Sequence, residues 1–297
     1  MPNSWIADLA RPLAVVCHDA GAANIIFAGI RDAEGAIRVL ARGPALPLAQ
    51  ASLPCEWLVD DMEEALEGAV TLLSGTGWAS DIEHDARHAA QRAGIRSIAV
   101  IDHWVNYRER FTRLSEEILP DEIRVTDPEA LALARAIFPG TPVTLHPNLY
   151  LAAAVAKIPP PPASPPTLLY VLEPARSTWG RERQGEFQAL DFFVENLPTL
   201  ALPQDLQIIL RPHPSDAAGK YDAWLAAHSN LDARLDTGPD IANTMAQARW
   251  VAGCESFALV LALAAGRQVL CTLPPWAPAC RLPHDGIRHL KRKDPAP

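Results

Sequence analysis

The chain has 297 residues, of which 49% are hydrophobic and 21% charged. This length suits two compact domains with separate cores, and this composition excludes a disordered or fibrous protein. The 26 basic and 35 acidic residues give a formal net charge of −9, so the chain as a whole repels polyanions and we expect no nucleic acid as a partner.

Apolar, β-rich runs alternate with helical patterns over residues 1–158. The strands expected there are residues 13–17, 37–41, 55–59, 69–73, 97–101, 123–126 and 143–145. Residues 78–93 carry apolar side chains at helical spacing, from Trp78 through Ile82 to Ala93. Asp127 is expected to cap a second helix that begins at Pro128 and runs to about residue 138.

A proline-rich stretch, PPPPASPP at residues 159–166, cannot form the interior of a helix or a sheet. We predict a stiff linker there, between domains at 1–158 and 167–297. After the linker, strands are expected at 167–172, 207–210, 249–253 and 268–271, with helices at 184–197 and 221–227. The predicted fold class is therefore α/β, with two doubly wound, Rossmann-like domains facing across a cleft.

Ligands of such sheets bind at the carboxyl ends of the strands, so the residues that follow each strand are the candidates for function. Arg211 and His213 follow the strand at 207–210 in the motif RPHP. An arginine fork suits phosphate, and a histidine can donate a hydrogen bond or a proton to a leaving phosphate. The alternative is a rigid turn with a solvated arginine.

The strand at 249–253 leads through Glu255 and Ser256 into an apolar helix at 257–265. The N-terminus of this helix is a candidate phosphate site that Ser256 also contacts, unless Ser256 simply caps a core helix. Glu255 opposes this interpretation because its charge competes for the same dipole, unless it binds a ribose hydroxyl or pairs with Arg211. Weaker candidates at this edge are Glu173, Arg176 and Thr237.

The order of these motifs resembles the C-terminal half of bacterial GT-B transferases of surface carbohydrate, which include CDP-glycerol, sialyl and polysialyl transferases. The resemblance covers residues 167–275. It implies that His213 and Ser256 bind nucleotide phosphates and that a CMP- or CDP-type donor is favoured over a UDP-type one. Glu255 departs from this pattern, which usually has a second hydroxyl residue or a glycine there.

In the first domain, the strand at 13–17 runs into His18 and Asp19, and a small-residue turn with Gly21 and Asn24 then opens a helix. The turn lacks the GxGxxG pattern of dinucleotide enzymes, while His18 and Asp19 are candidate bases. Similar two-domain sugar-nucleotide enzymes, including the hydrolase of the pseudaminic acid pathway, carry a base on this loop. Ordinary turn chemistry is the alternative.

Two more loops are expected at the same edge. Thr76 lies in the first, and Asp102, His103 and Trp104 form the second. Asp102 and His103 are interpreted as an acid/base pair or as groups that hydrogen-bond the hydroxyls of an acceptor, and Trp104 as a stacking face for a sugar. A buried polar cluster is the alternative. Arg108 and Arg110 are expected to bind an acidic acceptor or to be solvated.

Metal sites are not expected. His84 and His88 have the i, i+4 spacing of a zinc site, but they lie off the apolar stripe of their helix and are predicted to face solvent. The five cysteines never form CxxC or a zinc-finger spacing and fit reduced thiols in a cytosol. They are Cys17, Cys55, Cys254, Cys271 and Cys280.

The N-terminus lacks a signal-peptide pattern, and no apolar run approaches the ~20 residues of a membrane span, so a cytoplasmic protein is expected. Residues His289 to Lys293 form a basic tail that associates weakly with an anionic membrane surface or is simply solvated. The oligomeric state is left open.

The leading hypothesis is a nucleotide-sugar-dependent glycosyltransferase that uses no cofactor and modifies a cell-surface carbohydrate. A nucleotide-sugar hydrolase or epimerase is the enzymatic alternative. A non-catalytic carbohydrate- or nucleotide-binding partner in polysaccharide assembly is the alternative of another class.

Overall fold

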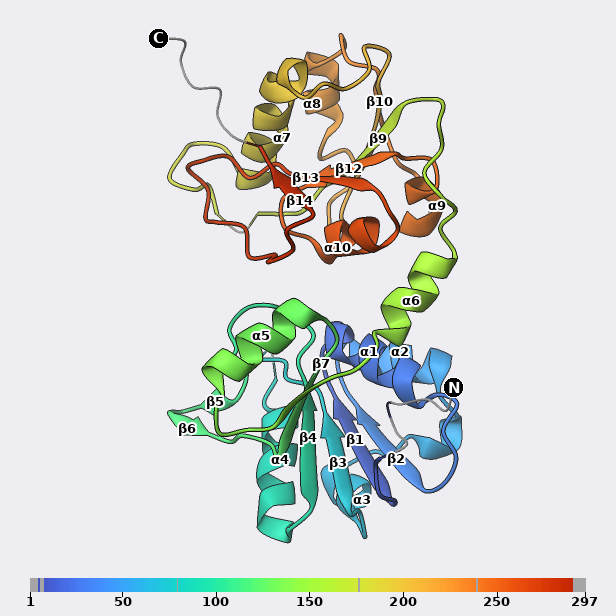
Figure 1. Cartoon of the computed structure of the whole chain (residues 1–297), viewed down its shortest axis with the longest axis vertical. Coiled ribbons are helices and arrows are strands. Elements are labelled where there is room, and N and C mark those ends of the chain that lie inside the picture. The colour runs from blue at the N-terminus through green and yellow to red at the C-terminus, as the bar shows by residue number, and fades with distance from the viewer. Residues whose placement is uncertain (1–4, 6–7, 79, 176, 239, 291–297) are drawn as a thin grey trace. The chain divides into compact units, whose positions relative to one another are not determined.

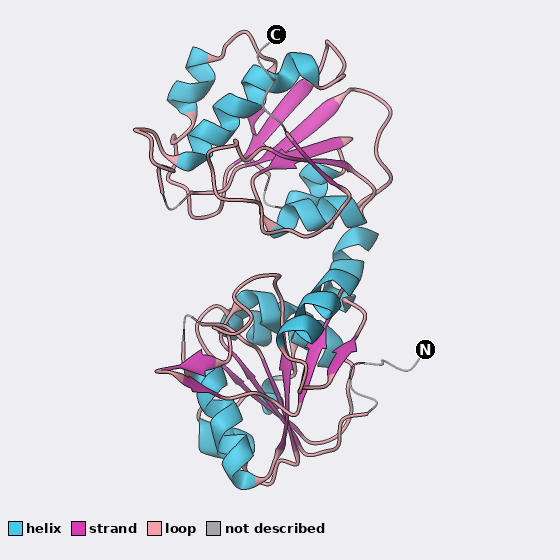
Figure 2. Ribbon diagram, turned by 60° about the vertical axis from the view of Figure 1, so that its left-hand side comes forward, coloured by secondary structure: helices cyan, strands magenta, loops and turns pink. Residues whose placement is uncertain are grey.

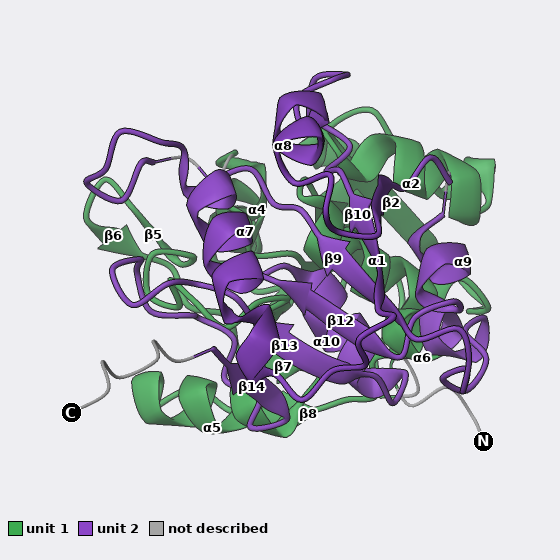
Figure 3. Cartoon of the chain, turned by 90° about the horizontal axis from the view of Figure 1, so that it is seen from above, with its two compact units in different colours: residues 1–152 green, residues 153–297 purple. Residues whose placement is uncertain are grey.

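Parallel strands and helices alternate along the chain in the computed structural model (Figure 1). The structure describes residues 5, 8–78, 80–175, 177–238 and 240–290. The chain divides into two compact units, residues 1–152 and 153–297, which are coloured separately in Figure 3. Each unit contains one six-stranded parallel sheet, so the predicted class of two Rossmann-like domains is confirmed.

The sheet of the first unit has the strand order β2-β1-β3-β4-β7-β8, and all neighbouring strands are parallel. Its strands are β1 (Leu13–Cys17), β2 (Ile37–Ala41), β3 (Thr71–Ser74), β4 (Arg96–Val100), β7 (Glu122–Val125) and β8 (Val143–Leu145). The helices are α1 (Ala20–Ile30), α2 (Ala45–Ser52), α3 (Met62–Leu66), α4 (Ile82–Ala93) and α5 (Pro128–Ile137). A short antiparallel hairpin joins β5 (Thr112–Arg113) and β6 (Glu116–Glu117).

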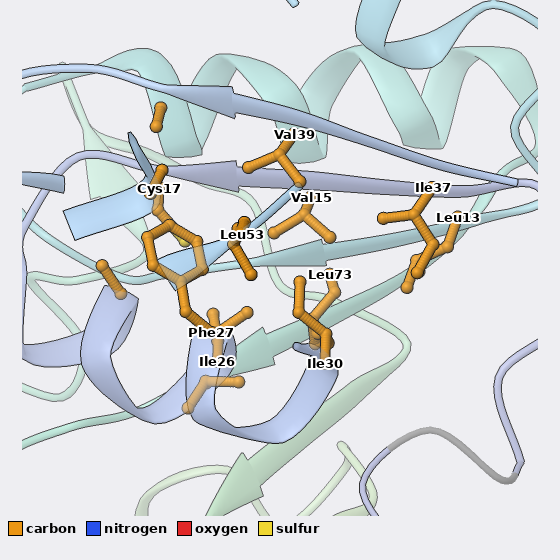
Figure 4. Close-up of a cluster of buried hydrophobic side chains, with 14 of the residues drawn as sticks. Leu13, Val15, Cys17, Ile26, Phe27, Ile30, Ile37, Val39, Leu53 and Leu73 are labelled. Atoms are coloured by element: carbon orange, nitrogen blue, oxygen red, sulfur yellow. The ribbon is translucent and has the colours of Figure 1, made fainter. Parts of the chain in front are cut away.

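Strand β1 is buried on both faces because alternate side chains enter different apolar clusters. Val15 and Cys17 pack with Ile26 and Phe27 of α1, as Figure 4 shows. Val16 faces the other way, toward the cluster that includes residues of α3 and α4. This burial fixes the end of β1, and with it the position of the loop that follows.

The sheet of the second unit has the order β11-β10-β9-β12-β13-β14. Its strands are β9 (Thr167–Val171), β10 (Gln207–Arg211), β11 (Ala233–Leu235), β12 (Trp250–Gly253), β13 (Gln268–Cys271) and β14 (Ile287–His289). The helices, coloured cyan in Figure 2, are α7 (Gly185–Asn196), α8 (Asp222–Ala227), α9 (Ile241–Met245) and α10 (Phe257–Ala264). An apolar cluster that includes Tyr170, Phe193 and Leu210 packs on this sheet.

The division between the units lies inside helix α6 (Leu149–Ala156). The proline-rich stretch 159–166 follows this helix, lies in the second unit and contains neither helix nor strand. The carbonyl of Pro159 accepts a hydrogen bond of 2.7 Å from the side chain of Arg267. The stretch is therefore attached to the unit that follows it.

Some sequence-based predictions of elements are wrong. Residues 55–59 were expected as a strand, but Cys55–Trp57 forms a 3₁₀ helix after Pro54, and only Leu58 bridges to Val39. The helix expected from Trp78 begins at Ile82 instead, so Trp78 lies in the preceding loop and is 47% exposed. Strands β11 and β14 were not predicted, because each has only three residues and no clear pattern of apolar side chains.

The prediction that His84 faces solvent is also wrong. Its side chain is buried, with a residue exposure of 4%, next to Arg113 and Glu116 of the β5–β6 hairpin. Burial, together with the charges of Arg87 and Arg113, lowers the pKa of His84. His88, one turn later, is half-buried.

Among the described residues, no helix has the length and apolar character that crossing a bilayer demands.

Candidate functional site

The first loop of the first unit joins His18 and Asp19 in a hydrogen-bonded pair. The His18 Nδ1 and Asp19 Oδ1 atoms lie 2.8 Å apart, with side-chain exposures of 19% and 31%. Because an ionised carboxylate only accepts hydrogen bonds, Nδ1 carries the proton and Nε2 carries the lone pair. The pair therefore has the arrangement of an oriented general base that remains in contact with solvent.

Gly43, which follows β2, lies directly against the His18 ring. A Cβ atom at this position would be 2.4 Å from Nε2, and the φ angle of +50° is itself one that favours glycine. The His18 carbonyl accepts a hydrogen bond of 2.9 Å from the Ala45 N–H. The loop after β2 thus contacts both the ring and the backbone of His18.

Glu83, in the first turn of α4, fastens the first loop to the loop after β3. Its fully buried carboxylate accepts hydrogen bonds from the backbone N–H groups of His18, at 2.8 Å, and Gly77, at 2.5 Å. Burial raises the pKa of Glu83, and the two N–H donors partly offset this effect. Glu83 was not predicted as a site residue, because a glutamate early in a helix has the pattern of ordinary N-terminal charge.

Two glycines leave room for the carboxylates of this edge. A Cβ at Gly77 would lie 2.1 Å from Oδ2 of Asp19, and a Cβ at Gly21 would lie 1.9 Å from Oδ2 of Asp102. The loops after β3 and β4 and the first turn of α1 therefore meet closely around these acidic groups. Asn24, one turn further along α1, is half-buried.

Asp102 forms a buried ion pair with Arg110, whose Nη1 lies 2.8 Å from Oδ1. The same guanidinium donates to the hydroxyl and the carbonyl of Thr76, and the Thr76 hydroxyl in turn donates to the Val100 carbonyl. The sequence had suggested that Arg110 is either solvated or free to bind an acidic acceptor. In the structure it is neither, because Asp102 and Thr76 engage its guanidinium. Arg108 is exposed and pairs with Glu117 at 3.3 Å.

Trp104 offers little surface to a ligand. It is 7% exposed, its Nε1 donates to Asp127 at 3.0 Å, and its backbone N–H donates to Nδ1 of His103. The exposed indole of this unit is Trp78, and the guanidinium of Arg110 lies 5.3 Å from its ring centroid. Trp78 thus has the exposure that a sugar-stacking side chain needs.

In the second unit, Arg211 turns toward α9. Its guanidinium forms an ion pair with Asp236 and donates to the Gly238 carbonyl at 3.2 Å. Burial raises the pKa of Asp236, but hydrogen bonds from Thr244, Gly238 and Arg211 outweigh this effect and lower it overall. Arg211 is thus engaged by its own unit. Thr237 is exposed in the same loop.

His213 is exposed, and its loop orients the ring. Nδ1 accepts a hydrogen bond of 3.1 Å from the Ser215 N–H, so in the neutral ring the proton lies on Nε2. The backbone N–H of His213 donates to Asp216 at 2.9 Å. Asp216 also accepts from Lys220 at 2.6 Å, which fixes the whole turn.

Ser256 caps α10, because its hydroxyl oxygen accepts a hydrogen bond of 3.2 Å from the Ala258 N–H. Glu255 pairs with Arg281 instead of Arg211, and its backbone N–H donates to Glu173 at 3.0 Å. Burial raises the pKa of Glu173. Arg176 lies outside the described residues.

A polar groove runs beside α7 and was not predicted from the sequence. Trp276 lines this groove and donates to Gln188 at 2.7 Å, and the Arg181 guanidinium lies 3.6 Å from the indole centroid. Arg183, just before α7, and Asp191, within it, also line the groove. No sequence pattern marks these residues, since they come from α7, the loop before it and a loop that is distant along the chain.

The sequence matches no protein-family model and no curated protein. Among solved structures, a Listeria monocytogenes protein assigned as a UDP-N-acetylglucosamine 2-epimerase is similar at a TM-score of 0.60 and 13% identity. The match covers 88% of this chain and 79% of that chain. The apo structure of OtsA gives a TM-score of 0.44 at 10% identity, over 85% of this chain and 81% of that one. The likeness to the first shows the fold alone, an α/β fold with two Rossmann-like units.

Proposed function

We propose that the protein is an enzyme that acts on a nucleotide-activated sugar, with His18 as its general base. The observation that carries the proposal is the His18–Asp19 pair, which presents Nε2 as a base at the carboxyl edge of a Rossmann-like sheet. Glu83 and Gly43 hold that pair in place, as a catalytic group requires.

In the transfer reaction, Nε2 of His18 takes the proton of an acceptor hydroxyl while the hydroxyl oxygen attacks the anomeric carbon. The bond between that carbon and the nucleotide phosphate breaks, and Asp19 stabilises the imidazolium that results. The second unit holds the nucleotide, with the His213 Nε2–H and the N-terminus of α10 as donors to its phosphates. We propose a surface carbohydrate as the acceptor and the cytoplasm as the location of the enzyme.

Epimerisation or hydrolysis is the second candidate, and the likeness to the Listeria monocytogenes protein assigned as an epimerase favours it. The same Nε2 would then remove a proton from the sugar ring or from a water molecule. Trp78 is the proposed stacking surface for the sugar in either reaction, because it is the exposed indole beside Arg110.

Nucleotide binding is tested first, by thermal unfolding with CMP, CDP, UDP, GDP and their sugar conjugates. A ligand at about 100 times its dissociation constant stabilises the folded state by ~2.7 kcal/mol. We expect one nucleotide class to raise the melting temperature, CMP or CDP above all, and His213→Ala to weaken that shift. If none of these ligands raises the melting temperature, the enzymatic proposal is refuted. The alternative of a protein that binds carbohydrate without catalysis is then favoured.

Catalysis is tested with the sugar nucleotide that stabilises the protein, by following nucleotide release and the fate of the sugar. His18→Ala should lower the rate by ~10²–10⁴-fold, the usual contribution of a general base. His88→Ala is the matched control, since it removes a half-buried imidazole from α4 in the same unit. Equal rates for His18→Ala and the unmodified protein would refute the assigned base, and the products distinguish transfer, hydrolysis and epimerisation.

A further inference from the structure

Three atoms that can bind a transition metal meet at the carboxyl edge of the second sheet. Cys271 ends β13, His289 ends β14, and the two residues are paired in the parallel ladder. Cys280 lies in the loop that joins these strands. The two sulfur atoms and one ring nitrogen all lie within 4.8 Å of one another.

The backbone holds these three residues in place. The Cys271 carbonyl accepts from the Leu290 N–H at 3.0 Å, which fixes the end of β14 beside β13. Glu255 accepts a hydrogen bond of 3.1 Å from the Arg281 N–H and also pairs with the Arg281 guanidinium. This double attachment anchors the loop at the residue next to Cys280, so the cluster is built before any ligand arrives.

Both thiols point at one backbone carbonyl. The Cys271 Sγ donates to the Cys254 oxygen at 3.0 Å, and the Cys280 Sγ lies 4.0 Å from the same oxygen. Cys271 is buried, Cys280 half-buried and His289 exposed, so the cluster runs from the interior to the surface. Packing accounts for a buried cysteine, but not for a second thiol and an exposed imidazole gathered around it.

We propose that Cys271, Cys280 and His289 bind a Zn²⁺ ion. Thiolate and imidazole are the ligands that zinc prefers, and Zn–S and Zn–N bonds of about 2.3 and 2.0 Å place tetrahedral ligand atoms ~3.5–3.8 Å apart. The separations of up to 4.8 Å need only a small contraction to reach that geometry. Each bound thiol releases its proton to solvent, and the exposed side near His289 leaves the fourth position to water.

This site was not expected from the sequence, because the spacing C-x₈-C-x₈-H matches no zinc motif. The parallel pairing of β13 and β14 brings the first and the last ligand together. The proposal is independent of the reaction proposed above, since it needs no substrate and concerns the second unit alone.

The test uses the full chain, freed of metal by a chelator and kept reduced with a phosphine, and titrates it with Co²⁺ as a spectroscopic substitute for Zn²⁺. We expect one equivalent to produce the visible bands of tetrahedral Co²⁺ and a near-ultraviolet thiolate-to-cobalt band, and one equivalent of Zn²⁺ to abolish both. A titration with only the weak spectrum of six-coordinate Co²⁺ would overturn the proposal.

Variants locate the ion. Cys280→Ser should halve the intensity of the thiolate band, and His289→Ala should weaken Zn²⁺ affinity at least about 10-fold, the lower end of what losing even an indirect metal contact costs. Cys55→Ser removes an exposed thiol of the first unit and should change neither signal. Circular dichroism in chelator confirms that each variant folds. Unchanged binding in both Cys280→Ser and His289→Ala would place the ion elsewhere and refute the site.

Discussion

His18 is held by contacts that come from several parts of the first unit. Asp19 fixes its Nδ1, the Glu83 carboxylate receives its backbone N–H, and Gly43 lies against its Nε2. Because Asp19 and Gly43 contact different atoms of the ring, while Glu83 holds the backbone, the imidazole has little freedom to turn. The side chain is nonetheless 19% exposed, so it remains accessible to a ligand.

Gly43→Ala tests this restraint at the scale of one residue. The φ angle of +50° disfavours any Cβ by ~1–2 kcal/mol, and the new methyl group would also collide with the His18 ring. Gly68→Ala is the matched control, because Gly68 has a φ of +65° but nothing within 4 Å of its Cβ position. Both variants should lose stability in urea unfolding, and only Gly43→Ala should shift the His18 ring signals in proton NMR. Equal shifts in both variants would contradict the contact.

At the scale of an element, the loop after β10 is kept in shape by Asp216. Burial raises the pKa of Asp216, but hydrogen bonds from Lys220 and from the His213 N–H outweigh it, so the pKa lies below its usual range. The side chain of Asp216 is only 2% exposed. The loop that presents His213 therefore depends on a buried carboxylate in its charged form.

The stability of the second unit should fall in acid for this reason. A carboxyl group whose pKa is lower in the folded than in the unfolded chain stabilises the fold above its unfolded pKa of about 3.9, and this contribution is lost as the pH falls further. Asp216→Asn should therefore be less stable near neutral pH, and its stability should change less below about pH 4. Urea unfolding across this range measures both effects. Asp205→Asn is the control, because Asp205 is exposed. If stability depends on pH in the same way in Asp216→Asn and in the unmodified protein, Asp216 does not have the proposed role.

At the scale of the whole molecule, each unit has an apolar core of its own. Leu73 is fully buried in the first unit and Leu210 in the second. Truncating either to Ala should cost ~2–5 kcal/mol, because a buried leucine leaves a cavity. We expect Leu73→Ala to lower hydrogen-exchange protection mainly in the first sheet and Leu210→Ala mainly in the second. Equal loss in both sheets for either variant would show that the units unfold together.

The sequence by itself determined the class of fold and many of its elements. Strands β1, β2, β8 and β13 have the bounds predicted, and Asp127 caps α5 as expected, because buried strands and helix caps leave local patterns. Local patterns also pointed to His18 and Asp19, since both directly follow a strand in a sheet whose ligands bind at that edge.

Only the tertiary structure decided which side chains engage one another. Glu83 accepts a hydrogen bond from His18, 65 positions away along the chain. Glu255 pairs with Arg281 and not with Arg211, and the pairing of β14 with β13 places His289 beside Cys271. The exposure of Trp78 and the burial of His84 likewise depend on where a loop or a hairpin folds back. These pairings arise from the order of strands in the sheet and the approach of distant loops, which no periodicity along the chain records.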